Sequence, residues 1–143
     1  MNSENDISSR AFRVLVVIND DADREAVIRH LGESWPFEHE MVPDKAGEAR
    51  EALDKMRRAR YALVVLDWQL PGMDGGELLR VMRQEGVLTP AIVVSGYPRE
   101  GISQKLELAG VVLLNQDDMN PRTLRDAVAA ALHQLGIDRA LAA

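Results

Sequence analysis

The sequence predicts an α/β domain in which helices cover both faces of a parallel β-sheet. Four short apolar runs rich in β-branched residues are typical of strands that are buried on both faces, and a fifth, weaker strand pattern accompanies them. Between these runs lie segments whose apolar residues recur with the helical period, so strands and helices alternate along the chain. The 143 residues also suffice to bury a core without disulfides, which fits the absence of cysteine.

The first strand and helix are predicted near the amino terminus. Residues 12–18 are almost wholly apolar and predict a buried strand. Asn19, Asp20 and Asp21 follow this strand, and their side chains favour turns and the beginning of helices. The helix that begins there carries its apolar residues on one side, and Gly32 is its predicted end.

The middle of the chain predicts a second and a third strand. Residues 37–42 form a weaker strand pattern, and a helical pattern follows over residues 46–59. Residues 61–66 are the most apolar strand segment of the sequence, and Asp67 follows them directly. A proline–glycine turn comes next, and Asp74 is a predicted cap for the helix after it.

The last third of the chain repeats the same alternation. Residues 91–94 predict a fourth strand that ends at Ser95, and a short helix is expected near residues 100–108. Residues 111–114 predict the fifth strand. The final helix has Asn120 as its expected cap, with a proline in its first turn, where the missing N–H costs nothing.

Strict alternation with right-handed crossovers predicts a single flavodoxin-like (βα)5 domain with strand order 2-1-3-4-5. In such sheets the functional crevice lies at the carboxyl ends of the strands, near the switch between strands one and three. Asp20 and Asp67 fall there, and two converging carboxylates repel each other unless a cation lies between them. Mg²⁺ suits this position, Asp67 could attack a phosphoryl group, and Ser95 could supply a hydroxyl.

Charge and hydropathy exclude other classes of function. A formal net charge of −6 argues against binding to nucleic acid, which requires clustered cations. No apolar run approaches the roughly 20 residues that cross a bilayer, and no signal peptide is evident, so a cytoplasmic protein is expected. The predicted boundaries are a disordered leader over 1–11, one domain over 12–136 and a tail over 137–143.

The segment Leu-Val-Val-Leu-Asp-Trp-Gln-Leu-Pro-Gly-Met-Asp-Gly at residues 63–75 resembles the signature of response-regulator receiver domains. The resemblance extends over residues 12–136. It implies that Asp67 is the phosphoacceptor, that Gln69 offers its backbone carbonyl to Mg²⁺, and that Ser95 is the phosphate-sensing hydroxyl. The family accepts its phosphoryl group from a histidine kinase or phosphotransfer protein.

The resemblance further implies that the output surface is the face of helix four, strand five and helix five, here about residues 100–135. A downstream protein would bind there. The chain is then expected to be a monomer or weak dimer and a switch rather than an enzyme, with weak self-phosphorylation and autodephosphorylation.

Three positions depart from the family pattern. The family usually has two adjacent acids after strand one. If Asn19 and Asp20 are aligned with these acids, Asn19 replaces the first of them. A register one residue earlier would align Ile18 and Asn19 with them and would leave no acid. Asp117 stands where the family has a lysine, which reverses the charge beside the phosphoryl group. Leu114 stands at the aromatic switch position of strand five.

The leading hypothesis is therefore an atypical stand-alone receiver that binds Mg²⁺ weakly at Asp20 and Asp67 and forms an acyl phosphate slowly or not at all. Asp117 would either join this cation site or point to solvent. A second hypothesis is a pseudo-receiver that binds its partner regardless of phosphorylation. A flavodoxin-like enzyme or nucleotide binder is the third, although the chain has no glycine-rich phosphate loop.

Overall fold

The computed structural model describes residues 11–96 and 110–134 of the protein. In these residues five parallel strands form one sheet in the order β2-β1-β3-β4-β5. The strands are β1 (Phe12–Val17), β2 (Met41–Ala46), β3 (Leu63–Asp67), β4 (Ala91–Ser95) and β5 (Val111–Asn115). The predicted flavodoxin-like sheet and its strand order are confirmed.

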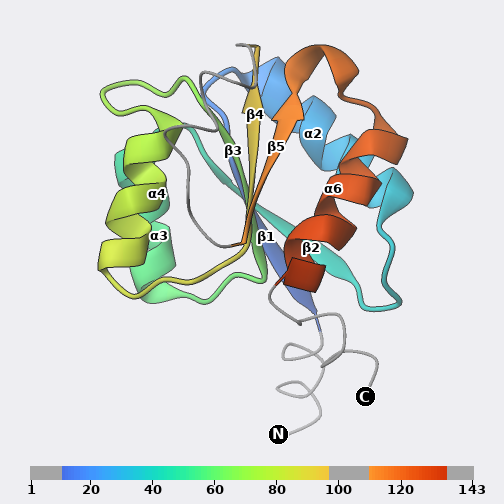
Figure 1. Cartoon of the computed structure of the whole chain (residues 1–143), viewed down its shortest axis with the longest axis horizontal. Coiled ribbons are helices and arrows are strands. Elements are labelled where there is room, and N and C mark those ends of the chain that lie inside the picture. The colour runs from blue at the N-terminus through green and yellow to red at the C-terminus, as the bar shows by residue number, and fades with distance from the viewer. Residues whose placement is uncertain (1–10, 97–109, 135–143) are drawn as a thin grey trace, which may run out of the picture.

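Helices cover both faces of the sheet, as Figure 1 shows, with α3 and α4 on one face and α2 and α6 on the other. The helical elements are α2 (Asp21–Ser34), α3 (Ala49–Arg58), α4 (Gly75–Gln84), the short 3₁₀ helix η1 (Gln116–Asp118) and α6 (Pro121–Gln134). The helix expected near residues 100–108, the predicted leader and the predicted tail lie outside the described residues, apart from residue 11. No helix in the described ranges combines the length and apolar character needed to span a bilayer.

The core consists of two apolar layers separated by the sheet. Successive side chains of a strand point to opposite faces, so the three central strands supply residues to both layers. The layer under α3 and α4 includes Leu15, Val17, Val64, Leu66, Ala91 and Val93. The layer under α2 and α6 includes Val14, Val16, Leu63, Val65, Ile92 and Val94. Burial on both faces explains why these strands read as nearly continuous apolar runs.

The second strand lies further along the chain than the predicted range 37–42. Phe37 precedes β2 and packs its ring against Phe12, with 5.2 Å between centroids, and against Trp35, with 5.5 Å between centroids. Phe37 is partly buried by these aromatic contacts in the loop before β2, so an apolar residue at this position does not mark a strand. β2 is an edge strand that contains Pro43, a residue tolerated there because one side of an edge strand needs no ladder hydrogen bond.

Two predicted helix limits also differ from the structure. Gly32 does not end its helix: α2 continues to Ser34, and Trp35 leaves the helical conformation. Trp35 precedes Pro36, and a residue before proline is sterically pushed toward extended backbone, so the proline rather than the glycine ends the helix. The helix predicted over 46–59 is shorter, because residue 46 belongs to β2.

The predicted helix caps are confirmed. The side chains of Asp20, Asp74 and Asn120 each accept a hydrogen bond from the backbone N–H three residues later, at 2.8, 2.8 and 2.9 Å. Each bond satisfies one of the N–H groups that the first turn of a helix leaves without a partner. The caps of α2 and α4 thereby fix where these helices begin relative to the carboxyl ends of β1 and β3.

Candidate functional site

Asp67 is the last residue of β3 and lies at the carboxyl edge of the sheet. It pairs in register with Val94 of β4, and the next N–H, that of Trp68, donates to the Val94 carbonyl at 2.9 Å. The Asp67 side chain is partly buried, and the backbone N–H groups of Trp68 and Gln69 hydrogen-bond its carboxylate. The strand end therefore presents a carboxylate that is positioned by the backbone rather than by a flexible loop.

The pKa of Asp67 is raised from its ordinary value of 3.8 to about 6, and burial is the largest cause of the rise. The charge of Asp23 contributes to the rise, and the hydrogen bonds from the N–H groups of Trp68 and Gln69 oppose it. Both causes of the rise act against the ionised carboxylate. A cation bound beside Asp67 would remove this disadvantage, so the surroundings of the carboxylate suit a metal ion of the kind that prefers oxygen ligands.

The polar side chains of the loop between β1 and α2 already form hydrogen bonds within the protein. Asp20 is exposed and caps α2 through one carboxylate oxygen, which accepts from the Asp23 N–H. Asn19 donates through Nδ2 to the Gly47 carbonyl at 3.0 Å and so connects this loop to the loop between β2 and α3. Val17 pairs with the residue before Asp67, so the next position along β1 is Ile18, which is buried.

Asp23 and Arg24, in the first turn of α2, are two residues near the site that the sequence alone did not indicate. Asp23 follows Asp20 by three positions, a spacing that places both on one side of the first helical turn and could have revealed it. Arg24 lies mostly buried; its Nη1 donates to the Ile18 carbonyl at 2.7 Å, and its Nη2 forms an ion pair with Asp21. Arg24 therefore anchors the helix start to the end of β1.

Replacing Asp23 with Asn should lower the pKa of Asp67 toward its ordinary value of 3.8. The reduction should be smaller than the contribution of burial, because burial is the larger cause of the rise. Titration of the Asp67 carboxyl carbon by NMR measures this effect. The control is Asp21→Asn, which removes an acid that is already paired with Arg24. An unchanged pKa in Asp23→Asn, or an equal fall in both variants, would contradict the assignment.

Ser95 and the end of β5 occupy the neighbouring strand ends. Ser95 is 5% exposed and pairs in register with Asn115. Asn115 accepts through Oδ1 from the Asp117 N–H at 2.8 Å, which places Asp117 in the exposed helix η1. Leu114 is partly buried and packs into the apolar layer under α2 and α6. Sheet register thus brings Asp67 and Ser95 to adjacent strand ends, whereas Asp117 is exposed on a separate turn.

The described ranges contain no group of three or more carboxylate or imidazole side chains arranged to hold a metal ion. Asp117 is exposed and belongs to helix η1. A cation beside Asp67 would need backbone carbonyls and water for most of its ligands, as Mg²⁺ usually does.

The loop after Asp67 brings the start of α4 directly against the backbone of the site. The Gly75 N–H donates to the Trp68 carbonyl at 2.7 Å. A Cβ atom at Gly75 would lie 2.7 Å from the Asp67 carbonyl oxygen, and one at Gly76 would lie 2.8 Å from the Trp68 ring. Trp68 is buried and belongs to the apolar layer under α3 and α4. The two glycines therefore permit a close approach that places α4 in contact with Asp67.

Comparison with known proteins adds the following similarities. Residues 14–130 match the family model described as response regulator receiver domain. Over 90 residues the chain is 33% identical to a protein-glutamate methylesterase/protein-glutamine glutaminase of Treponema denticola. Over 94 residues it is 36% identical to the response regulator MprA of Mycolicibacterium vanbaalenii. These matches cover 63% and 66% of this chain but only 23% and 38% of the respective relatives.

A solved structure shares the fold over nearly its full length. The response regulator protein TrrA of Thermotoga maritima, determined in complex with Mg²⁺ and BeF, aligns with a TM-score of 0.67 and 27% sequence identity. The alignment covers 85% of this chain and 99% of that one.

Proposed function

The chain belongs to the response regulator receiver domain family of two-component systems, and we propose that Asp67 is its phosphoacceptor. The observation that carries this proposal is the placement of Asp67 at the end of β3, partly buried and hydrogen-bonded by two backbone N–H groups. Receiver domains are signalling switches that interact with kinases or phosphotransfer proteins and with downstream effectors. A carboxylate in this position can act as a nucleophile toward a phosphoryl group.

In the proposed reaction a carboxylate oxygen of Asp67 attacks the phosphorus of a phosphohistidine on the donor protein. A P–O bond forms as the P–N bond breaks, and the departing imidazole keeps the electron pair and takes up a proton from water. Ser95, buried at the next strand end, would donate its hydroxyl to a phosphoryl oxygen. The result is an acyl phosphate whose hydrolysis returns the domain to its initial state.

Mg²⁺ is the proposed cofactor, held by the carboxylates of Asp20 and Asp67 and by the backbone carbonyl of Gln69. When bound, the ion would offset negative charge on the phosphoryl oxygens. The raised pKa of Asp67 supports this assignment, because a cation favours the ionised form that burial and Asp23 disfavour. Asp20 has one carboxylate oxygen in the α2 cap, which leaves the other for the ion.

We further propose that the site is atypical, because three positions lack the residues that the family uses. Asn19 is neutral and its side chain is directed to Gly47, Asp117 contributes a negative charge, and Leu114 has no aromatic ring to respond to Ser95. Acyl-phosphate formation would then be slow and metal binding weak. Output would pass through protein–protein contacts on the face formed by residues 100–135, of which residues 100–109 and 135 lie outside the described ranges.

Incubation with Mg²⁺ and acetyl phosphate, followed by intact-mass spectrometry, tests both proposals. The expected result is a slow, partial gain of one phosphoryl group that Asp67→Asn abolishes and Ser95→Ala slows. Asp126→Asn, a change of an exposed acid on α6, should behave like the natural chain. Rapid and stable labelling would refute the atypical character alone. Labelling that persists in Asp67→Asn would refute the phosphoacceptor assignment.

The pseudo-receiver is a second candidate, favoured by the repulsion between the charges of Asp23 and Asp67. On this proposal the acids no longer support phosphorylation, and the domain binds its partner in a single state. Unchanged partner affinity in both Asp67→Asn and Asp67→Glu would support it, whereas a change in either variant would count against it.

A further inference from the structure

A cavity of about 580 Å³ lies at the edge of the sheet opposite Asp67. Residues 56–61, at the end of α3 and in the loop before β3, form one wall, and residues 86–89, in the loop before β4, form the other. Both loops lead into the amino-terminal ends of their strands, whereas Asp67 and Ser95 lie at the carboxyl ends. We call this cavity the amino-edge pocket. A ligand there would not obstruct phosphoryl transfer at Asp67.

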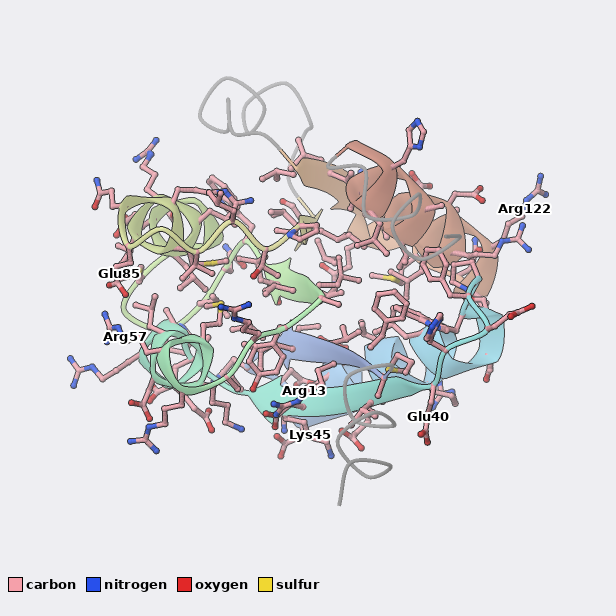
Figure 2. The ribbon with its side chains drawn as sticks, turned by 90° about the horizontal axis from the view of Figure 1, so that it is seen from below. Arg13, Glu40, Lys45, Arg57, Glu85 and Arg122 are labelled. Atoms are coloured by element: carbon pink, nitrogen blue, oxygen red, sulfur yellow. The ribbon has the colours of Figure 1, made fainter. Side chains whose placement is uncertain are left out.

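The lining of the amino-edge pocket is positively charged although the whole chain carries a net charge of −6. Three arginines contribute to it, and two of them have structural tasks. Arg57 donates to both carboxylate oxygens of Glu85, at 2.8 and 2.5 Å, and Figure 2 shows the two residues side by side between α3 and α4. Arg58 pairs with Asp54 at 3.3 Å, and both arginines favourably face the negative end of the α3 dipole.

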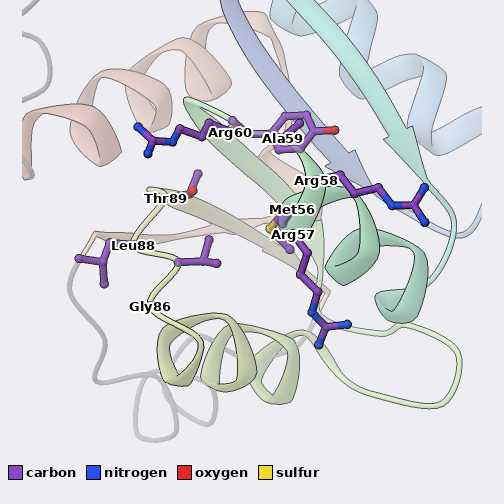
Figure 3. Close-up of a pocket in the computed structure, with 10 residues that line it drawn as sticks. Met56, Arg57, Arg58, Ala59, Arg60, Gly86, Leu88 and Thr89 are labelled. Carbon is purple, nitrogen blue, oxygen red and sulfur yellow. The ribbon is translucent and has the colours of Figure 1, made fainter.

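Arg60 differs from Arg57 and Arg58 because no acid in the described ranges is paired with it. It follows the end of α3, is exposed, and forms no ion pair or side-chain hydrogen bond with any residue in the described ranges. Figure 3 shows Arg60 and Leu88 extending from the two walls toward the same side of the pocket, with Thr89 between them. The pocket therefore presents an uncompensated cation next to a hydroxyl and an apolar side chain.

Leu88 is held in an exposed position by its surroundings. It is 67% exposed, the most of any large apolar side chain in the described ranges. Arg83 donates through Nη1 to the carbonyls of Val87 and Thr89, at 2.8 and 3.0 Å, and thereby fixes the loop on both sides of Leu88. Gly86 supplies the positive φ, +81°, that turns the chain into this loop. The apolar contact surface is thus preformed and needs little ordering on binding.

We propose that the amino-edge pocket binds an acidic peptide segment of a partner protein. A carboxylate of the segment would pair with Arg60 and accept a hydrogen bond from Thr89, while a neighbouring apolar side chain would cover Leu88. Charge complementarity selects this occupant, because Arg60 is the arginine of the pocket lining that no acid in the described ranges neutralises, whereas Arg57 and Arg58 are paired. Since the pocket is remote from Asp67, the segment would bind whether or not the receiver is phosphorylated.

Fluorescence anisotropy with a labelled peptide of alternating glutamate and leucine tests this proposal on the full chain. Arg60→Gln should weaken binding about fivefold, as for loss of an exposed ion pair, and Leu88→Ser about tenfold through lost apolar burial. Arg29→Gln is the matched control, because Arg29 is an exposed, ion-paired arginine on α2, across the sheet. Amide NMR signals of residues 56–61 and 86–89 should shift on titration.

Several results would overturn the proposal. These are equal binding of a lysine–leucine peptide, equal weakening in Arg29→Gln and Arg60→Gln, or peptide-induced shifts confined to other residues. Self-association in light scattering that the peptide does not displace would assign the pocket to a second copy instead. Asp67→Asn should bind the peptide as the natural chain does, so failure of phosphorylation at Asp67 leaves this test intact.

Discussion

Replacing Asp67 with Asn is expected to stabilise the fold by about 1–2 kcal/mol at pH 7 and by much less at pH 4. The folded chain holds the Asp67 carboxyl in a partly buried position near Asp23, where ionisation is disfavoured. At pH 7 the carboxyl is nonetheless ionised, so the native state carries an unfavourable charge. An amide of nearly the same shape removes that charge.

The dependence on pH follows from the two pKa values. In the unfolded chain the carboxyl ionises near its ordinary value of 3.8, and in the folded chain near about 6. Between these values the folded state retains a proton that the unfolded state has released, so stability falls as the pH rises from about 4 to about 6 and is level above that. The full difference would correspond to roughly 3 kcal/mol, which partial exposure to solvent reduces.

Urea unfolding of both chains at pH 4, 5, 6 and 7 measures this prediction. The gain from Asp67→Asn should grow across that range, whereas Asp126→Asn, an exposed acid of α6, should give no such trend. Saturating Mg²⁺ should raise the stability of the natural chain at pH 7 and leave Asp67→Asn largely unaffected. A variant that is less stable than the natural chain at pH 7 would show that the carboxylate is compensated in the fold.

Replacing Gly75 with Ala is expected to destabilise the fold by about 2–4 kcal/mol. The added Cβ would lie 2.7 Å from the Asp67 carbonyl oxygen and 3.1 Å from the Trp68 Cα. Both are backbone atoms of the site, so no flexible side chain can rotate away to make room. Either α4 moves outward and weakens the hydrogen bond from the Gly75 N–H to the Trp68 carbonyl, or the end of β3 shifts.

The matched control is Gly32→Ala in the interior of α2. Its Cβ would meet nothing closer than the Met41 Cε at 4.0 Å, so the change should stabilise the chain by up to about 1 kcal/mol through helix propensity. Thermal and urea unfolding of the two variants measure the contrast. Gly75→Ala should also change the pKa of Asp67. The added Cβ would press on the backbone carbonyl of Asp67, and any shift of that backbone also moves the side-chain carboxyl of the same residue. Equal stability of both variants would refute the close-approach argument.

Burial pattern explains why the sheet could be predicted from the sequence. Strands β1, β3 and β4 are covered on both faces, so their apolar runs admit few other interpretations. The edge strand β2 carries Pro43 and exposed residues, so no continuous apolar run marks it. The predicted strand therefore began too early, at Phe37, whose ring packs against Phe12.

The candidate site was predictable only where it depends on strand ends. Asp67 and Ser95 follow apolar runs directly, so topology alone places them together. The contribution of Asp23 depends on how α2 leaves β1, which the Asp20 cap and the Arg24 anchor determine. Those contacts are local, but the distance between Asp23 and Asp67 also depends on how α2 packs against the sheet, which the sequence pattern does not specify.

Helix α4 is attached to its neighbours at both ends, and these attachments limit how α4 can move relative to β3 and α3. Its first residue abuts the Asp67 backbone, and Glu85, directly after its last residue, is joined to Arg57 of α3. Ten residues of helix span about 15 Å between these two attachments. A rigid body held at two points can rotate only about the line that joins them. Any larger displacement of the β3 end must therefore either carry α3 along with α4 or break the ion pair at the far edge of the sheet.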